Sequence, residues 1–128
     1  MKKSIISFNI LATFLLCYAS LSHAFESYEH LENEVGCKSK YSDSKKEDIY
    51  YSRYHGEIFI WTGKVFDSDK GEVSLNLDGF GMPDLTVYFS DGHTGYDLLK
   101  DDVITVKFRM RDLGGCFLPF FGEDAVLR

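Results

Sequence analysis

The first segment of the chain is an apolar run between a positive start and a group of small residues. The run Ile5–Leu16 follows Lys2 and Lys3 and precedes Ser22–Ala24. This order is typical of a secretory signal peptide, and the run is shorter than the roughly 20 apolar residues of a membrane span. We predict a signal peptide over residues 1–24 with cleavage after Ala24, and an uncleaved N-terminal anchor is the alternative. The lysine start resembles bacterial signals, so we expect a periplasmic or secreted protein without a membrane span after cleavage.

The segment after the predicted signal has a different pattern. Tyr28–Lys40 has apolar residues three to four positions apart, and it is acidic at its start and basic at its end. That spacing and that charge order predict a helix. Ser39–Asp48 has no periodic apolar face and is expected to be a loop or a solvated helical turn. Residues 25–48 are therefore expected to form an N-terminal helix and a polar linker before a β domain of residues 49–128.

From residue 49 onward, apolar and polar residues alternate in short segments that turn residues separate. Alternation with a period of two predicts half-buried strands. The expected strands are Ile58–Phe66, Glu72–Leu77, Leu85–Phe89, Val103–Met110 and a last one from Cys116–Phe121 with Ala125–Leu127. Gly63 is expected to form a bulge or bend in the first strand. Tyr96–Lys100 is expected to form a short helix between the third and fourth strands.

This order of elements predicts the fold class. Five strands with a helical link between the third and fourth are typical of an OB-fold, a small and partly open Greek-key barrel. We therefore expect a mainly β protein with a five-stranded OB-fold-like barrel, an N-terminal helix and a short helix between strands 3 and 4.

Two short motifs resemble those of a known group. Trp61–Val65 is similar to the "tGkV" first strand of small exported OB-fold domains of the tRNA_anti-like type, and Tyr50–Gly56 resembles their lead-in. Leu98–Val106 is similar to their "L-k-k-G-D-x-V-t-V" entry to the fourth strand, but Asp101 replaces the glycine. The resemblance covers residues 50–127 and implies the fold more than a function, because its motifs are mainly structural.

Two cysteines follow the predicted signal peptide. Cys37 and Cys116 are far apart in the sequence and form no CxxC motif, whereas Cys17 lies within the signal. In an oxidising compartment such a pair predicts a structural disulfide, and a redox or metal pair is the alternative. The chain-entropy model assigns about 4 to 5 kcal/mol to closing so long a loop.

The charge of the chain bears on its partners. Removing residues 1–24 takes away two of the 14 basic residues and none of the 20 acidic ones, so the net charge becomes 12 − 20 = −8. An acidic protein is repelled by nucleic acids and by anionic membranes unless a basic patch overrides the field. Nucleic acid is therefore disfavoured as the main partner.

Two sets of residues on the expected barrel surface are candidates for ligand binding. OB-folds commonly bind on the face of strands 2 and 3, where the alternation places Ser74, Asn76, Thr86 and Tyr88 outward. The outer face of the fourth strand carries a basic stripe at a period of two, consisting of Lys107, Arg109 and Arg111. The stripe suits an anionic ligand or an acidic partner. Its alternative is a solvated edge strand that uses charge against aggregation.

Other chemistry receives little support from the sequence. The chain has no GxSxG, no phosphate-binding glycine loop and no HExxH, and His30, His55 and His93 lack metal-ligand spacing. Asn76–Asp84 resembles a calcium loop, but Phe80 occupies a position where such loops place a carboxylate. We interpret this segment as a backbone turn and expect no metal and no cofactor.

These observations predict an exported, non-enzymatic OB-fold binding module that acts on a protein, a peptide or a glycan of the cell envelope. The alternative is a binder of single-stranded nucleic acid or another anionic ligand, which would use the basic stripe and stacking aromatic residues.

Overall fold

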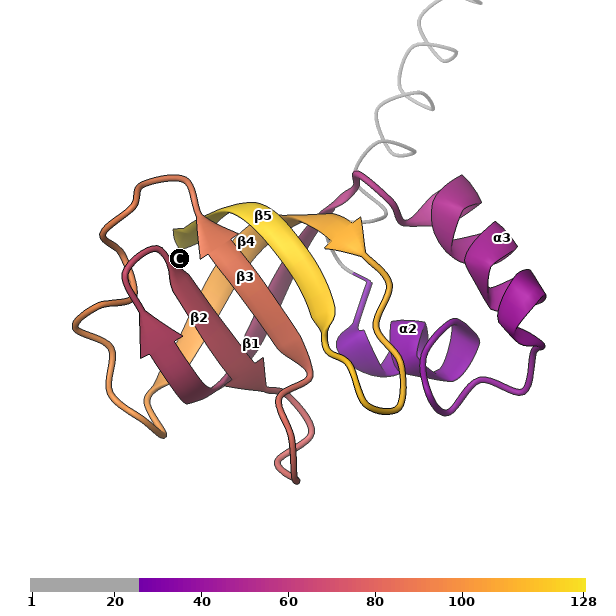
Figure 1. Cartoon of the computed structure of the whole chain (residues 1–128), viewed down its shortest axis with the longest axis horizontal. Helices are drawn as coiled ribbons and strands as arrows, with labels where there is room; N and C mark the ends of the chain where they lie inside the picture. Colours follow the sequence, from indigo (N-terminus) through magenta and orange to yellow (C-terminus); the bar gives the residue numbers. More distant parts are fainter. Residues whose placement is uncertain (1–25) are drawn as a thin grey trace, which may run out of the picture.

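Five strands form a closed barrel in the computed structural model, which describes residues 26–128 (Figure 1). The predicted signal peptide and its cleavage site after Ala24 lie outside the described residues. The strands are β1 (Ile58–Asp69), β2 (Glu72–Asn76), β3 (Leu85–Phe89), β4 (Val103–Asp112) and β5 (Phe120–Leu127). Their order around the barrel is β1-β2-β3-β5-β4, and β4 pairs with β1 to close it. The predicted mainly β fold with an OB-fold-like barrel is confirmed.

Pairing within the barrel is antiparallel except between β3 and β5, which run parallel. The alternation predicted for the strands places one face of each inside the barrel. The interior consists of buried apolar side chains, namely Phe59, Trp61, Val65, Val73, Leu75, Leu85, Val87, Phe89, Val106, Phe108, Met110, Phe120 and Ala125. A register slip of one residue would exchange the two faces of a strand. The burial of these side chains therefore confirms the predicted inward and outward sides of β2, β3 and β4.

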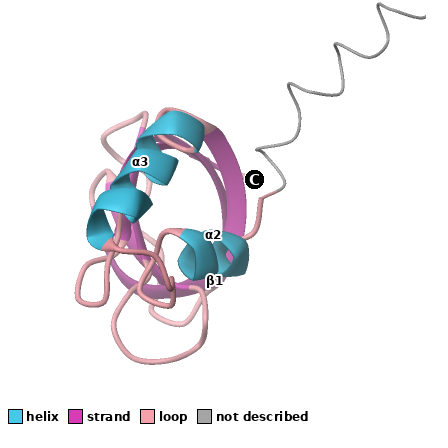
Figure 2. Cartoon of the chain, turned by 90° about the vertical axis from the view of Figure 1, so that its right-hand side faces the viewer, coloured by secondary structure: helices cyan, strands magenta, loops and turns pink. Residues whose placement is uncertain are grey.

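Two helices, α2 (Tyr28–Glu34) and α3 (Asp43–Arg53), lie in front of one end of the barrel (Figure 2). Leu31 of α2 and Tyr50 of α3 are fully buried and belong to the same apolar cluster as the barrel interior. The helices therefore extend the core of the barrel. Among the described residues, no helix is long and apolar enough to cross a membrane.

Helix α2 is shorter than the expected Tyr28–Lys40. Ser27 caps its start by accepting a hydrogen bond from the His30 backbone N–H at 3.1 Å. The helix ends before Gly36, whose backbone N–H donates to the carbonyls of Leu31 and Glu32. A side chain at Gly36 would meet Glu32, so glycine permits this tight end of the helix.

Within Ser39–Asp48, where a loop or a solvated helical turn was expected, helix α3 begins at Asp43, and it crosses residue 48, where the linker was expected to end. Ser42 caps it through a 3.3 Å hydrogen bond from the Lys45 backbone N–H. Its two buried residues, Ile49 and Tyr50, are adjacent and lie in its second half. The first half is solvated, so the sequence has no periodic apolar pattern that would predict the helix.

The connection from β3 to β4 contains turns and bends in place of the short helix expected at Tyr96–Lys100. Single hydrogen bonds, such as Leu98 N–H to the Gly95 carbonyl at 3.2 Å, close these turns. Gly95 has a φ of 107° and Asp101 a φ of 71°, and both values interrupt right-handed helical geometry. Asp101 thus adopts the left-handed conformation at the position where the resembling domains carry glycine.

Several details of the strands differ from expectation. β1 ends at Asp69 and β4 at Asp112, beyond the expected Phe66 and Met110, and β2 ends at Asn76, one residue early. The irregular register of β1 lies between Val65 and Asp67 rather than at Gly63, where the β2 chain approaches closely instead. The last strand starts at Phe120, so Cys116 lies in the loop between β4 and β5. Pro119 precedes the strand, which leaves the strand's hydrogen-bonding pattern intact.

Gly122 of β5 provides a test of barrel packing. A Cβ atom at this position would overlap the ring of Phe108, which is fully buried. We expect Gly122→Ala to lower the free energy of unfolding by about 1 to 3 kcal/mol because the closed core cannot relax freely. Gly92→Ala is the matched control, since a Cβ there meets nothing within 4 Å. Urea denaturation of both variants measures the difference, and equal effects would contradict a tightly packed β4–β5 contact.

Candidate functional site

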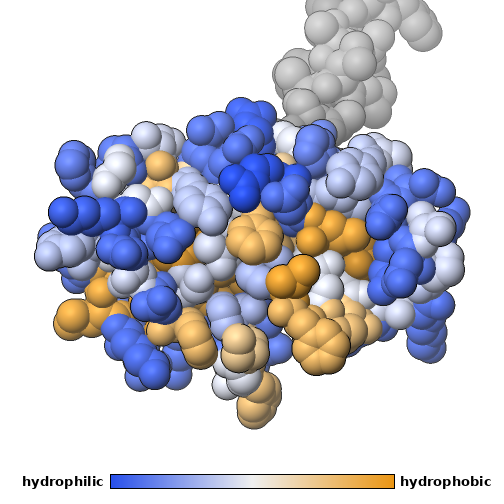
Figure 3. All heavy atoms as spheres, in the orientation of Figure 1, coloured by the Kyte–Doolittle hydropathy of each residue, from blue (hydrophilic) through white to orange (hydrophobic). Residues whose placement is uncertain are grey.

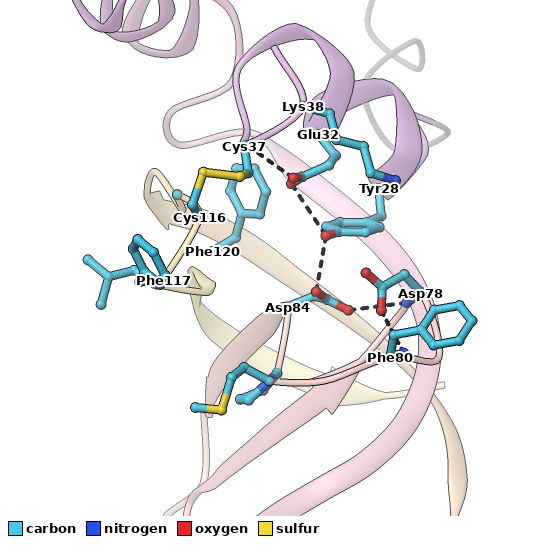
Figure 4. A pocket seen from close by; sticks show the side chains of 14 residues that line it. Tyr28, Glu32, Cys37, Lys38, Asp78, Phe80, Asp84, Cys116, Phe117 and Phe120 are labelled. Atoms are coloured by element: carbon cyan, nitrogen blue, oxygen red, sulfur yellow. Dashed lines mark hydrogen bonds between the residues drawn. A yellow bond between two sulfur atoms is a disulfide. The ribbon is translucent and has the colours of Figure 1, made fainter.

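A pocket of about 420 Å³ lies where three segments distant in sequence meet (Figure 4). Helix α2 and the residues just after it form one side, the β2–β3 loop the second, and the β4–β5 loop the third. The lining residues are Tyr28, Glu32, Cys37, Lys38, Asp78, Phe80, Met82, Pro83, Asp84, Gly115, Cys116, Phe117, Leu118 and Phe120. This combination of polar and apolar groups in a concave site is typical of a binding site.

A hydrogen-bonded group of side chains joins two sides of the pocket. The Tyr28 hydroxyl lies 3.1 Å from Asp84 Oδ1 and 3.3 Å from Glu32 Oε2. Asp84 Oδ2 accepts hydrogen bonds from the backbone N–H groups of Leu77 at 2.7 Å and Asp78 at 3.1 Å. Glu32 Oε1 accepts one from the Cys37 backbone N–H at 3.0 Å. These bonds fix the β2–β3 loop against α2 and hold the two carboxylates in the pocket.

Three carboxylates, Glu32, Asp78 and Asp84, and one lysine, Lys38, line the pocket, so its formal charge is negative. Burial is the main cause that raises the pKa of Asp84, in opposition to the two backbone hydrogen bonds that it accepts. Burial, followed by the charges of Asp84 and Glu32, raises the pKa of Tyr28, so its hydroxyl stays protonated. Among the described residues, no basic side chain forms an ion pair with Glu32, Asp78 or Asp84.

Exposed apolar side chains line the two loop sides of the pocket. Two come from the β2–β3 loop, Phe80 and Met82 at 80% and 72% exposure, and two from the β4–β5 loop, Phe117 and Leu118 at 94% and 65%. In Figure 3, apolar surface gathers over the region of these two loops. We call these four residues the apolar rim. Exposed apolar clusters with polar surroundings are typical of interaction sites.

The disulfide predicted between Cys37 and Cys116 is confirmed and lies in the wall of the pocket (Figure 4). Its Cα atoms are 4.6 Å apart, and 79 positions separate the two residues in the sequence. It links the end of α2 to the β4–β5 loop. The bond thereby holds the loop that carries Phe117 and Leu118 next to the carboxylates.

The residues expected to bind on the outer face of strands 2 and 3 do point away from the core. However, Ser74 and Thr86 satisfy each other through a 2.8 Å hydrogen bond between their hydroxyls, and Thr86 is only 8% exposed. The Asn76 side chain bonds within the β2–β3 loop, to Gly79 N–H and the Gly81 carbonyl. Tyr88 is the most exposed of the four. This face therefore offers few free polar groups.

The basic stripe Lys107, Arg109 and Arg111 lies on the outside of β4. The alternative of an edge strand is wrong, because β4 pairs with both β1 and β5 in the closed barrel. Two of the three cations are paired, Arg109 with Asp124 at 3.5 Å and Arg111 with Asp112 at 2.9 Å. These pairs reduce the attraction of the stripe for an anion.

One contact joins the two predicted candidate sets. The guanidinium of Arg111 lies over the Tyr88 ring at 5.0 Å and over the Phe121 ring at 5.8 Å. Tyr88 and Arg111 are thus neighbours, although the sequence placed them in separate sets. The guanidinium is already stacked and paired, so it is committed to contacts within the barrel surface.

The Asn76–Asp84 segment forms a turn built on its own hydrogen bonds. Asn76 Oδ1 accepts from Gly79 N–H at 2.8 Å, and Asp78 Oδ1 accepts from Phe80 N–H at 2.9 Å. The side-chain oxygens of Asp84 bond as described above, and within residues 26–128 no cluster of three or more His, Cys, Asp or Glu could hold a metal ion. The side-chain oxygens of Asn76 and Asp78 thus accept hydrogen bonds from the backbone of the loop, in agreement with its interpretation as a turn.

The chain matches no protein-family model, no curated protein and no solved structure.

The pocket itself was missed from the sequence. One signal was present in the chain, because Phe80, Met82, Phe117 and Leu118 occupy turns rich in glycine and proline, where burial is rare. Four large apolar residues in two such loops indicate a surface that has a use other than folding.

Proposed function

We propose that this protein is an exported, non-enzymatic binding module that captures a segment of a protein or peptide in the cell envelope. The observation that carries the proposal is the apolar rim around a formed pocket, which two loops and one helix build together. A rim of phenylalanine, methionine and leucine suits side chains of a polypeptide, since such groups gain by leaving water. The disulfide supports export, because such bonds persist in oxidising compartments.

A protein segment fits these residues better than a glycan does. On the outer face of β2 and β3, the hydroxyls of Ser74 and Thr86 bond to each other, which leaves that face few groups for a sugar. The rim also contains aliphatic side chains beside its aromatic ones. The proposal includes a barrel of the tRNA_anti-like type, which the motifs at Trp61–Val65 and Leu98–Val106 support.

Selection from a displayed library of random peptides, on the purified disulfide-bonded protein, tests the proposal. We expect enriched peptides whose binding falls at least about tenfold in a Phe117→Ala/Leu118→Ala variant, because two rim contacts are lost. Leu99→Ala/Val103→Ala is the matched control, since these side chains are similarly exposed and lie on the β3–β4 side of the barrel. Failure to enrich any peptide, or binding that both double variants reduce equally, would overturn the proposal. Binding to a glycan array without peptide binding would overturn it too.

A further inference from the structure

The side chains that line the pocket carry a net negative charge, because three carboxylates outnumber the one lysine, Lys38. Glu32, Asp78 and Asp84 all line the pocket, and within residues 26–128 none of the three has a basic partner in an ion pair. Tyr28 brings one hydroxyl proton to two of these carboxylates. Charges withdrawn from water without a counter-charge are unfavourable, and Asp84 is partly withdrawn, as its raised pKa indicates.

The three carboxylates retain capacity for new hydrogen bonds. Within the chain, Asp84 accepts three bonds, Glu32 two and Asp78 one. An ionised carboxylate has about four acceptor positions, so each keeps at least one that is open. The groups that would use these positions best are N–H donors with a positive charge, since such hydrogen bonds are about twice as strong as neutral ones.

An inorganic cation fits the pocket poorly. Calcium needs six to eight oxygen ligands, and both oxygens of Asp84 already accept hydrogen bonds from N–H and O–H groups. An organic cation needs fewer contacts and can bring an apolar stem. The apolar rim lies beside the carboxylates, so the same ligand meets apolar and negative groups within one site.

We infer that the pocket accepts a lysine or arginine side chain of a partner protein, and that apolar residues next to it in the partner's sequence contact the rim. The inference rests on the proposed function and adds the chemistry of the occupant. The long stem of a basic side chain passes between the two loops, and its charged end meets Asp78, Asp84 and Glu32. The negative charge of the protein, 12 − 20 = −8 without residues 1–24, favours the approach of such a basic segment.

Three blocked peptides test this inference. Each has a central Leu-X-Phe sequence in which X is arginine, norleucine or glutamate, and calorimetric titration gives each Kd. We expect the arginine peptide to bind about tenfold or more tightly than the norleucine peptide, as one charge-assisted hydrogen bond predicts, and the glutamate peptide to bind worst. Free butylammonium should bind far more weakly than the arginine peptide, because it lacks the rim contacts.

Substitutions of the carboxylates test which of them cause the preference for arginine over norleucine. Asp84→Asn should remove most of the advantage of arginine over norleucine, and Asp78→Asn serves as a second variant if the loss of Asp84 disturbs the β2–β3 loop. Asp97→Asn is the control, because it removes the same charge from the exposed β3–β4 connection. A preference for arginine that all three variants retain would refute the inference.

The outcomes separate the inference from the proposed function. Equal binding of all three peptides, abolished in Phe117→Ala/Leu118→Ala, would refute the basic side chain but keep the peptide-binding function. Absence of binding by every peptide, together with no enrichment from the random library, would refute both. Butylammonium binding as tight as that of the arginine peptide would identify a site for small amines and refute a protein segment as the occupant.

Discussion

Replacing both cysteines, in the variant Cys37→Ser/Cys116→Ser, is expected to lower the free energy of unfolding by about 4 to 5 kcal/mol. The bond closes a loop with a sequence separation of 79, so its loss gives the unfolded chain much more conformational freedom. Small domains are stabilised by about 5 to 15 kcal/mol in total, and the variant would therefore be close to unfolding. Urea denaturation, followed by the fluorescence of Trp61, measures the change, since this single tryptophan is 5% exposed.

Reduced wild-type protein is the control for the cysteine variant. It should unfold at the same urea concentration as Cys37→Ser/Cys116→Ser, because both lack the same cross-link. A loss of less than about 1 kcal/mol would contradict the expectation and would mean that the unfolded chain is already compact without the bond. Peptide binding should weaken in either form, since the bond holds the β4–β5 loop beside α2.

Strands β2, β3 and β4 were predictable because apolar and polar residues alternate in each of them. In β2, Val73 and Leu75 alternate with Glu72, Ser74 and Asn76, and a half-buried strand leaves this period in any sequence. Helix α3 was not predictable in the same way. Its burial depends on two adjacent residues that pack on the barrel, and its remaining surface is polar, so tertiary contact rather than periodicity reveals it.

The pocket could not be predicted because its parts meet only in the folded barrel. Tyr28 and Asp84 are 56 positions apart, and their hydrogen bond depends on α2 lying against the end of β2 and β3. A pairing of this kind has no local sequence signal. The candidate residues on the strands were placed outward correctly. However, the hydroxyls of Ser74 and Thr86 bond to each other and Arg109 pairs with Asp124, and these contacts between strands depend on the strand register.

Stability and binding should be separable in this protein, because the apolar residues of the core and of the rim differ in burial. Phe108 of β4 is fully buried, with its ring 6.0 Å from that of Phe59 and 5.3 Å from that of Trp61. We expect Phe108→Ala to lower the free energy of unfolding by about 3 to 5 kcal/mol, since the closed barrel cannot collapse onto the cavity. Urea denaturation measures this effect on the protein with its disulfide intact.

Phe80→Ala makes the same chemical change at the apolar rim and is the matched variant. The Phe80 side chain is 80% exposed, so its truncation should change stability by no more than about 0.5 kcal/mol. Its effect should appear in peptide binding instead. If Phe80→Ala destabilised the fold as much as Phe108→Ala, the rim would belong to the core, and its exposure would no longer indicate a binding surface. A large loss of stability in Phe108→Ala and a small one in Phe80→Ala would assign Phe108 to folding and Phe80 to recognition, although both are phenylalanines of one small barrel.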